Sequence, residues 1–128
     1  MLKDRNSSAI VAVTDIERAR AFYEDTLGLT RIPAEGEEDM LEFQTGDTRL
    51  TVYRSEFAGT NRANAVTWEM KGDLVETVRS LQNKGVAFEH YPDMEGLTLN
   101  GDIHEAGGVK LVWFKDPDGN ILHLIEGM

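Results

Sequence analysis

The sequence of 128 residues contains no cysteine. This absence excludes disulfide bonds, thiolate zinc sites and cysteine nucleophiles. The chain also lacks an apolar run approaching the ~18 residues of a membrane span. Its start, MLKDRNSS, is too polar for a secretory signal. It has no P-loop, no dinucleotide-binding glycine motif and no Ser-His-Asp order. We therefore expect a soluble, cytoplasmic protein that uses none of these chemistries.

Basic residues are scarce, because 13 Lys and Arg stand against 23 Asp and Glu, for a net charge of -10. Phosphate backbones need a concentrated basic surface, so nucleic acid is not expected as a partner. The plainer interpretation of the acidity is solubility. A sharper interpretation is a pocket whose field favours cationic ligands, and the sequence leaves both open.

The first half of the chain predicts a strand, a helix and three further strands. AIVAVT (9–14) is a β-branched apolar run typical of a strand. Asp15 follows as an N-cap, and IERARAFYEDTL then carries apolar residues at helical spacing until Gly28 ends the helix. The segments LTRIPA (29–34), DMLEFQT (39–45) and TRLTVYRS (48–55) predict strands, the last two joined by a hairpin turn at TGD.

The second half repeats this order after the polar linker RSEFAGTNRAN. A strand is predicted at AVTWEM (65–70), and a helix follows at LVETVRSLQNK, where Asp73 and Glu76 have capping-box spacing. Further strands are expected at VAFEHY, DIHEA, VKLVWFK and NILHLIE, and DPDG (116–119) has type I turn chemistry. The chain therefore predicts an α+β fold of two βαβββ modules, residues 8–55 and 64–127, with helices outside and two sheets around a cavity or cleft.

Two stretches resemble a known family. AVTDIERARAFYEDTLGL and WFKDPDGNILHLIE are similar to the vicinal oxygen chelate superfamily, which contains glyoxalase I, extradiol dioxygenases, fosfomycin-resistance enzymes and bleomycin-resistance proteins. The resemblance covers nearly the whole chain and implies a single glyoxalase-like domain, residues 1–128, whose modules form a cup. It does not specify the reaction, because members share the scaffold and differ in their sites.

Metal-dependent members of the superfamily hold a divalent metal in the cup with His, Gln or Glu from four strands. The resemblance places these positions at Ser8, Thr51, Ala65 (or Asn64, if the register shifts by one) and His123. Among Ser8, Thr51, Ala65 and His123, only His123 is a good metal ligand, whereas a catalytic metal site needs about three protein ligands. The resemblance therefore implies no metal cofactor, and a metal held by a displaced ligand set is the alternative.

Alternation within the strands identifies the residues expected to line the cup, a mixture of aromatic, aliphatic and polar groups typical of a small-molecule site. The expected ligand-binding residues are Ser8, Thr51, Tyr53, Ala65, Glu69, Trp113 and His123. Trp113 or Tyr53 could stack on a cationic aromatic ligand, although both could equally be core residues. Arg49 is expected to be solvated beside its hairpin, and His90 and His104 are expected at the surface near loops.

The catalytic assignment stays open between several alternatives. Glu69 and His123 would form an acid–base pair if both faced one cup, with the carboxylate raising the pKa of the histidine. Otherwise His123 bonds a neighbour on its strand and Glu69 is solvated. Two functions compete: a protein that binds a small organic molecule without metal, similar to the bleomycin-resistance branch, and a metal-dependent lyase or extradiol-type dioxygenase. Exposed sheet edges favour a homodimer in either case.

Overall fold

The computed structural model describes residues 1–33 and 38–127, and it divides into two compact units. Unit 1 comprises residues 1–61 together with the short segment 117–120. Unit 2 comprises residues 62–116 and the chain from 121 onward. Within the described residues, none of the helices has the length and apolarity needed to cross a bilayer.

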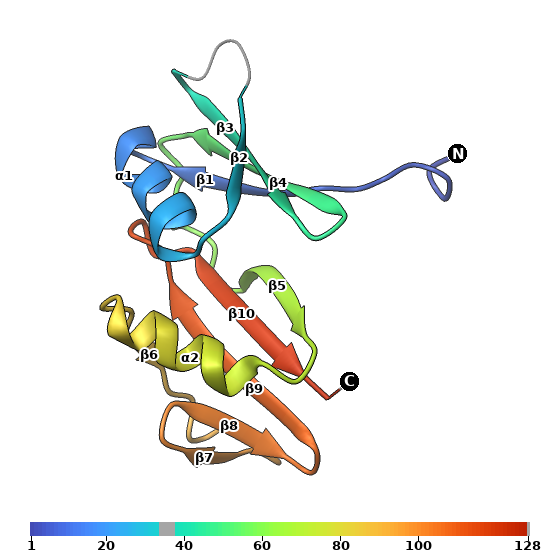
Figure 1. The fold of residues 1–128 in the computed structure, drawn as a ribbon, viewed down its shortest axis with the longest axis vertical. Helices are drawn as coiled ribbons and strands as arrows, with labels where there is room; N and C mark the ends of the chain where they lie inside the picture. The colour runs from blue at the N-terminus through green and yellow to red at the C-terminus, as the bar shows by residue number, and fades with distance from the viewer. Residues whose placement is uncertain (34–37, 128) are drawn as a thin grey trace. The chain divides into compact units, whose positions relative to one another are not determined.

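Unit 1 has the order strand, helix, strand, strand, strand (Figure 1). Its elements are β1 (Ala9–Val13), α1 (Ile16–Arg20), the π-helical segment η1 (Ala21–Thr26), β2 (Thr30–Ile32), β3 (Met40–Thr45) and β4 (Thr48–Arg54). The sheet order is β1-β4-β3-β2, with β1 parallel to β4 and the remaining pairs antiparallel. The predicted hairpin at TGD joins β3 to β4, and Ala34 of the predicted strand 29–34 lies outside the described residues.

The helix of unit 1 begins where the sequence indicates. Asp15 is its N-cap, and the carboxylate accepts a hydrogen bond of 3.1 Å from the backbone N–H of Arg18. After Arg20 the backbone widens to the π-helical segment, so that the N–H of Leu27 bonds the carbonyl of Phe22. Tyr23 in this segment is fully buried and packs against Phe43 of β3.

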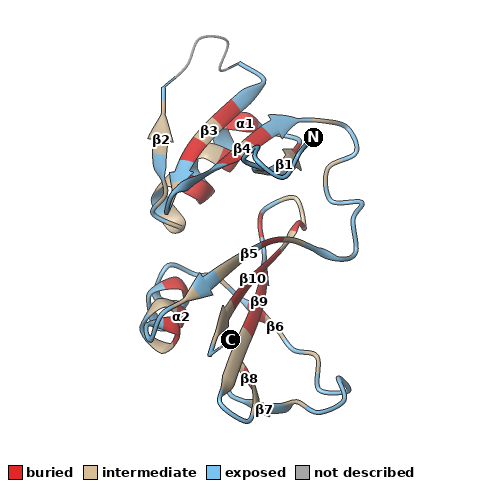
Figure 2. Cartoon of the chain, turned by 90° about the vertical axis from the view of Figure 1, so that its right-hand side faces the viewer, coloured by how far each residue is buried: buried red, intermediate tan, exposed pale blue. Residues whose placement is uncertain are grey.

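Buried residues alternate with more exposed ones along the strands of the unit 1 sheet (Figure 2), so its two faces differ in exposure. One face is buried, and its residues are Val11, Val13, Leu41, Phe43, Leu50 and Val52. Ile16 and Ala19 of α1 are buried as well, and the helix contacts β3 and β4. The alternate residues of the strands point away from this core, as Ile10 does at 61% exposure.

Unit 2 follows the same plan with two additional short strands. Its elements are β5 (Asn64–Met70), α2 (Leu74–Asn83), β6 (Phe88–Glu89), β7 (Thr98–Asn100), β8 (Ile103–Ala106), β9 (Val109–Lys115) and β10 (Ile121–Glu126). The sheet order is β5-β10-β9-β8-β7, β6 pairs with β9, and β5 runs parallel to β10. Leu74, Val78 and Leu81 of α2 are buried, and this helix contacts β10.

These arrangements confirm the predicted α+β class and the two βαβββ modules, and both sheets are open. The expected capping box of the second helix is wrong, because the side chain of Asp73 caps no helical N–H. Its carboxylate accepts from the N–H of Lys71 instead, and Glu126 of β10 accepts from the N–H of Leu74 at 3.0 Å. A carboxylate distant in sequence therefore takes the place of the local one.

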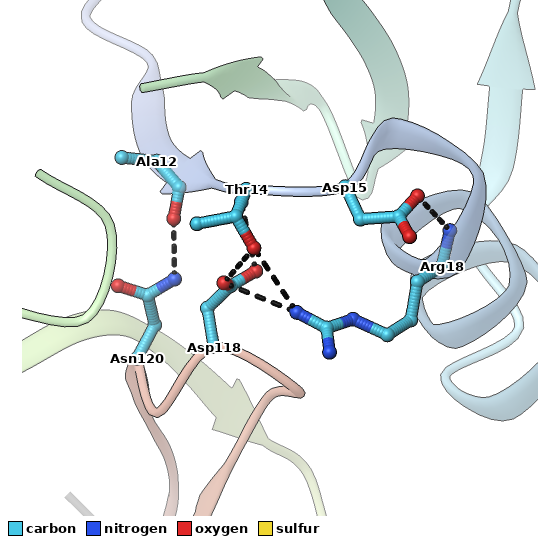
Figure 3. Close-up of polar contacts among 6 residues, drawn as sticks. All are labelled: Ala12, Thr14, Asp15, Arg18, Asp118 and Asn120. Carbon is cyan, nitrogen blue, oxygen red and sulfur yellow. Dashed lines mark hydrogen bonds and ion pairs between the residues drawn. The ribbon is translucent and has the colours of Figure 1, made fainter. Parts of the chain in front are cut away.

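The turn between β9 and β10 contributes to unit 1 rather than to unit 2. Asn120 is buried, and its side-chain amide donates a hydrogen bond of 2.7 Å to the carbonyl of Ala12 in β1 (Figure 3). A side chain at Gly59 would collide with the carbonyl of Asp118, so glycine is required where this turn packs. The sequence predicted the turn from DPDG but not its attachment to β1.

Candidate functional site

The face of the unit 2 sheet that carries Trp113 holds a group of four rings, which we call the Trp113 cluster: Tyr91, His104, Trp113 and His123. Because β9 and β10 pair antiparallel, His123 lies directly opposite Trp113. The two rings stack with centroids 4.7 Å apart and planes at 21°. His104 and Tyr91 meet Trp113 at nearly perpendicular angles, with centroids 4.9 and 5.3 Å away. The four rings form one packed aromatic assembly.

Asn64 anchors the indole of this cluster. The indole N–H of Trp113 donates a 3.1 Å hydrogen bond to the side-chain oxygen of Asn64. The register between β10 and β5 shifts at Ile121 and Leu122, which pair with Asn64 and Val66 and leave Ala65 without an opposite partner. This bulge brings Asn64, the alternative to Ala65 in the sequence, to the cluster.

His123 is held in one orientation and one tautomer. It is 5% exposed, and its Nδ1 lies 3.0 Å from the carbonyl of Val112, so Nδ1 carries the hydrogen and donates. Burial lowers the pKa of His123, and the Val112 carbonyl offsets part of that shift. A neutral ring with an unprotonated Nε2 can accept a hydrogen bond or ligate a metal.

The metal-ligand positions implied by the resemblance do not fit a divalent metal. Ser8 is exposed and Thr51 is half-buried, both in unit 1, whereas Ala65 and His123 belong to unit 2. Hydroxyl and methyl side chains are weak ligands or none. Residues 1–33 and 38–127 contain no group of three or more His, Cys, Asp or Glu side chains that could hold a metal ion. His123 is thus the one good metal ligand among these four positions, and the other three supply no further ligands for it.

Glu69 does not pair with His123 in the structure. Across the β5–β10 ladder His123 lies beside Thr67, and Glu69 lies beside Ile125. Glu69 is exposed, and the pKa of His123 shifts downward through burial, whereas a close carboxylate would raise it. The two residues share strand parity, but the acid–base contact considered from the sequence is not formed.

His104 was expected at the surface, and this expectation is wrong. The ring is fully buried, and its Nε2 accepts a 2.9 Å hydrogen bond from the backbone N–H of Tyr91. Burial lowers the pKa of this histidine, and the backbone of Leu111 offsets part of that shift. The signal available in the sequence was alternation within DIHEA, which places His104 opposite Leu111 of β9. His90 is exposed as expected, and it bonds Asp102 at 2.7 Å.

The sheet face of unit 1 that points away from α1 exposes apolar groups. Tyr53 of β4 lies between Ala12 of β1 and Met40 of β3, and the exposed fractions of Tyr53 and Met40 are 38% and 41%. Ile10 is the strand partner of the half-buried Thr51 on the same face. Tyr53 is therefore more accessible to a ligand than Trp113, which is 7% exposed.

A pocket of about 750 Å³ lies in unit 1 beside the β3–β4 hairpin. Its lining residues come from the segment before β1 and from the hairpin, and they are Arg5, Asn6, Ser7, Ser8, Gln44, Asp47, Thr48 and Arg49. A second pocket of about 450 Å³ is lined by Thr14, Arg54, Ser55 and Glu56. Of the ligand-binding residues expected from the sequence, Ser8 alone lines either of these two pockets.

Residues 7–124 match the Glyoxalase/Bleomycin resistance protein/Dioxygenase superfamily, and the chain belongs to this superfamily. The comparison with curated proteins gave no match. The family assignment therefore rests on nearly the whole chain, and the reaction is not assigned by it.

Solved structures agree with this assignment at the level of the fold. A protein described as a glyoxalase family protein from Bacillus anthracis shares 22% identity, covers 97% of this chain and 99% of its own, and has a TM-score of 0.72. A glyoxalase/dioxygenase from Nostoc punctiforme has 19% identity, coverages of 98% and 93%, and a TM-score of 0.71. The fosfomycin resistance protein FosX from Listeria monocytogenes has 12% identity, coverages of 99% and 96%, and a TM-score of 0.73. Identities this low establish the shared fold alone.

Proposed function

We propose that this protein binds a small organic molecule without a metal, on sheet faces that point away from the helices. The observation that carries the proposal is the exposed apolar face of unit 1, where Ile10, Met40 and Tyr53 are 61%, 41% and 38% exposed. Apolar groups gathered on one surface are typical of ligand-binding grooves and interfaces. Thr51 on the same face adds a hydroxyl that can orient a ligand.

Tyr53 and Trp113 take different parts in this proposal. Tyr53 is exposed and can lie against an apolar or aromatic ligand. Trp113 is buried, one face of its indole is stacked on His123, and its N–H is bonded to Asn64. Trp113 therefore acts as a rigid support that fixes His123. On the neighbouring strand β5, Thr67 lies opposite His123 and Glu69 lies two residues further along, and both side chains are exposed.

The chemistry of the available side chains supports binding without metal. Ser8, Thr51 and Ala65 occupy three of the family ligand positions, and Asn64, which the bulge brings close, already uses its oxygen to hold Trp113. A catalytic site with one histidine ligand would leave most coordination positions to water, which gives weak and unselective binding.

A metal-dependent lyase or dioxygenase is the second candidate, and one observation favours it. His123 donates from Nδ1 to the Val112 carbonyl and keeps Nε2 free of hydrogen, which is the arrangement of a metal-ligating histidine. This function requires further ligands outside the expected positions.

A thermal-shift screen with separate metal and organic-compound arms tests the proposal. An organic ligand at 100-fold its dissociation constant stabilises the fold by about 2.7 kcal/mol. Tyr53→Ala should weaken the response to such a ligand. Phe57→Ala is the matched control, because Phe57 is an exposed aromatic residue of the same unit outside the sheet. Ligand binding that requires a divalent metal would contradict the proposal and favour the enzyme.

A further inference from the structure

The pocket beside the β3–β4 hairpin gathers two arginines and several other hydrogen-bond donors in an acidic protein. Arg5 and Arg49 contribute two guanidinium groups, and Asn6, Ser7 and Ser8 contribute an amide and two hydroxyls. Asp47 is the acidic residue in the lining. Guanidinium groups present paired N–H donors that match the two oxygens of a carboxylate or phosphate.

The two arginines differ in how they are held. Arg49 on β4 forms an ion pair with Glu42 of β3, with a nitrogen–oxygen distance of 3.3 Å, and its side chain is 56% exposed. This single contact leaves other guanidinium N–H groups unused by that pair. Arg5 precedes β1, and its side chain has no ion pair within the described part of the chain. One arginine is thus oriented and the other has its whole donor set available.

Other polar groups of the lining are occupied by the hairpin itself. The side-chain amide of Gln44 donates to the carbonyl of Gly46 at 2.6 Å, and the hydroxyl of Thr48 donates to the carbonyl of Thr45 at 3.0 Å. These bonds fix the rim of the pocket on the hairpin. The donors that remain for a ligand come from the segment 5–8 and from Arg49.

The net charge of -10 does not decide which ions this pocket attracts. Charges more than about 8 Å away are largely screened at physiological ionic strength, so the nearest groups dominate. Two arginines and one aspartate line the pocket, and Glu42 pairs with Arg49, so the preference for an anion rests on the guanidinium N–H groups left over from that pair and on the donors of residues 5–8.

The pocket adjoins the apolar face on which the proposed ligand would lie. Ser8 and Ile10 have the same parity along the chain entering β1, and Arg49 and Thr51 have the same parity along β4. The pocket volume of about 750 Å³ also falls within the range of small-molecule sites. A ligand with one anionic end could place that end among the arginines and its apolar part against Ile10 and Tyr53.

We propose that the pocket lined by Arg5, Ser8 and Arg49 binds the carboxylate or phosphate group of a small organic ligand. The inference deepens the proposed function and rests on it for the organic part of the ligand. This inference differs from the cationic ligand that the overall acidity of the chain suggested, because the groups that line this pocket are hydrogen-bond donors.

Inorganic phosphate is the direct probe of this pocket. Titration of the full chain, followed by backbone and arginine side-chain NMR signals, should shift residues 5–8 and 44–49 with saturation. Arg5→Gln and Arg49→Gln should each weaken phosphate binding at least about tenfold, as expected for loss of a charge-assisted hydrogen bond. Arg79→Gln is the control of equal charge, because Arg79 is exposed on α2 in unit 2. Arg5→Gln removes no side-chain hydrogen bond or ion pair within the described residues, so the fold should stay intact.

Three outcomes would overturn the inference. Phosphate could produce no saturable shift, sodium chloride at equal ionic strength could reproduce the shift, or Arg79→Gln could weaken binding as much as Arg49→Gln. A separate screen of neutral, cationic and anionic organic compounds distinguishes this failure from failure of the proposed function. Tyr53-dependent binding of neutral or cationic compounds, without phosphate binding, would reject the anionic pocket alone. Phosphate binding without any organic ligand would support the pocket and reject the broader proposal.

Discussion

Asp118 and Thr14, which are 104 positions apart, are joined by two hydrogen bonds in unit 1. The hydroxyl of Thr14 donates to one carboxylate oxygen at 2.6 Å, and the backbone N–H donates to the other at 3.1 Å (Figure 3). Arg18 completes the arrangement with a 3.2 Å ion pair to the same carboxylate. The motif residues that carried the family resemblance thus hold a turn against β1 and α1, and their role here is architectural.

Asp118→Ala should destabilise the protein by about 1–2 kcal/mol, because the N–H and hydroxyl of Thr14 and the exposed guanidinium of Arg18 lose a charged acceptor. The Asp118 side chain is only 6% exposed, so water replaces it poorly. Chemical denaturation measures the free energy of unfolding. Asp93→Ala is the matched control on an exposed loop residue and should change it by less than about 0.5 kcal/mol. Equal effects of both substitutions would contradict the assignment.

The sequence predicted the parts of the fold that depend on local spacing. The Asp15 cap, the βαβββ order and the TGD hairpin are all short-range signals and are all present. The sequence prediction failed where a residue distant in sequence caps the helix. At the second helix, Glu126 accepts the hydrogen bond that the expected capping box would have made. The π-helical segment after Arg20 also had no signal, because its apolar spacing resembles that of an α-helix.

The candidate site was predicted less completely than the fold. Strand alternation put Trp113 and His123 among the expected cup residues, and the structure shows that they are neighbours across β9 and β10. It left Ala65 and Asn64 as alternatives, because the bulge that brings Asn64 to the cluster depends on the packing of the whole sheet. His104 was misplaced because a short strand bounded by glycine and charged residues resembles a surface loop, whereas β7 and β9 flank it in the sheet. The pocket at Arg5 and Arg49 combines segments whose proximity requires the β1–β4 pairing.

Mild acid should destabilise the protein through two histidines. Burial lowers the pKa values of His104 and His123 below the ordinary 6.5, so the unfolded chain binds protons more readily than the folded one. Their stabilising contribution is complete above pH 6.5 and is lost as the pH falls toward the lowered values. Each histidine contributes a slope of up to about 1.4 kcal/mol per pH unit.

Urea denaturation between pH 7.5 and about 5, above the main carboxylate range, measures this dependence. His104→Gln should reduce the slope, because glutamine can still accept from the Tyr91 N–H but does not titrate there. Asn83→Gln serves as the control, since Asn83 is exposed at the end of α2 and does not titrate. An unchanged slope in His104→Gln would contradict the assignment.

Trp113→Phe should show whether Trp113 supports His123 or contacts the ligand directly. The substitution keeps an aromatic ring against His123 but removes the N–H that bonds Asn64. We expect stability to fall by about 1–3 kcal/mol, because the Asn64 oxygen loses its partner and a cavity forms. Ligand affinity should change less than in Tyr53→Ala. A loss of affinity larger than in Tyr53→Ala, measured on folded protein, would instead make Trp113 a direct ligand contact.

Elemental analysis of protein purified without chelator should find no stoichiometric divalent metal. The expectation follows from the side chains at Ser8, Thr51 and Ala65, which leave His123 as a lone ligand. His123→Ala is the decisive variant if a metal is found. Stoichiometric nickel, zinc, iron or manganese that disappears in this variant would reverse the expectation and favour the lyase or dioxygenase.

Homodimer formation is the remaining prediction, and the open sheets supply its physical reason. β1 and β2 form the edges of the unit 1 sheet, β5 and β7 those of the unit 2 sheet, and proteins tend to cover such edges. Sedimentation at micromolar concentration should give a mass of twice 14.3 kDa.

Ile10→Glu, at a 61% exposed position of edge strand β1, should weaken self-association because it places charge on an apolar surface. Leu2→Glu is the matched control, since Leu2 is 77% exposed and precedes the sheet. A monomeric mass for the unmodified chain would reject the prediction, and equal behaviour of the two variants would exclude the β1 surface from the contact.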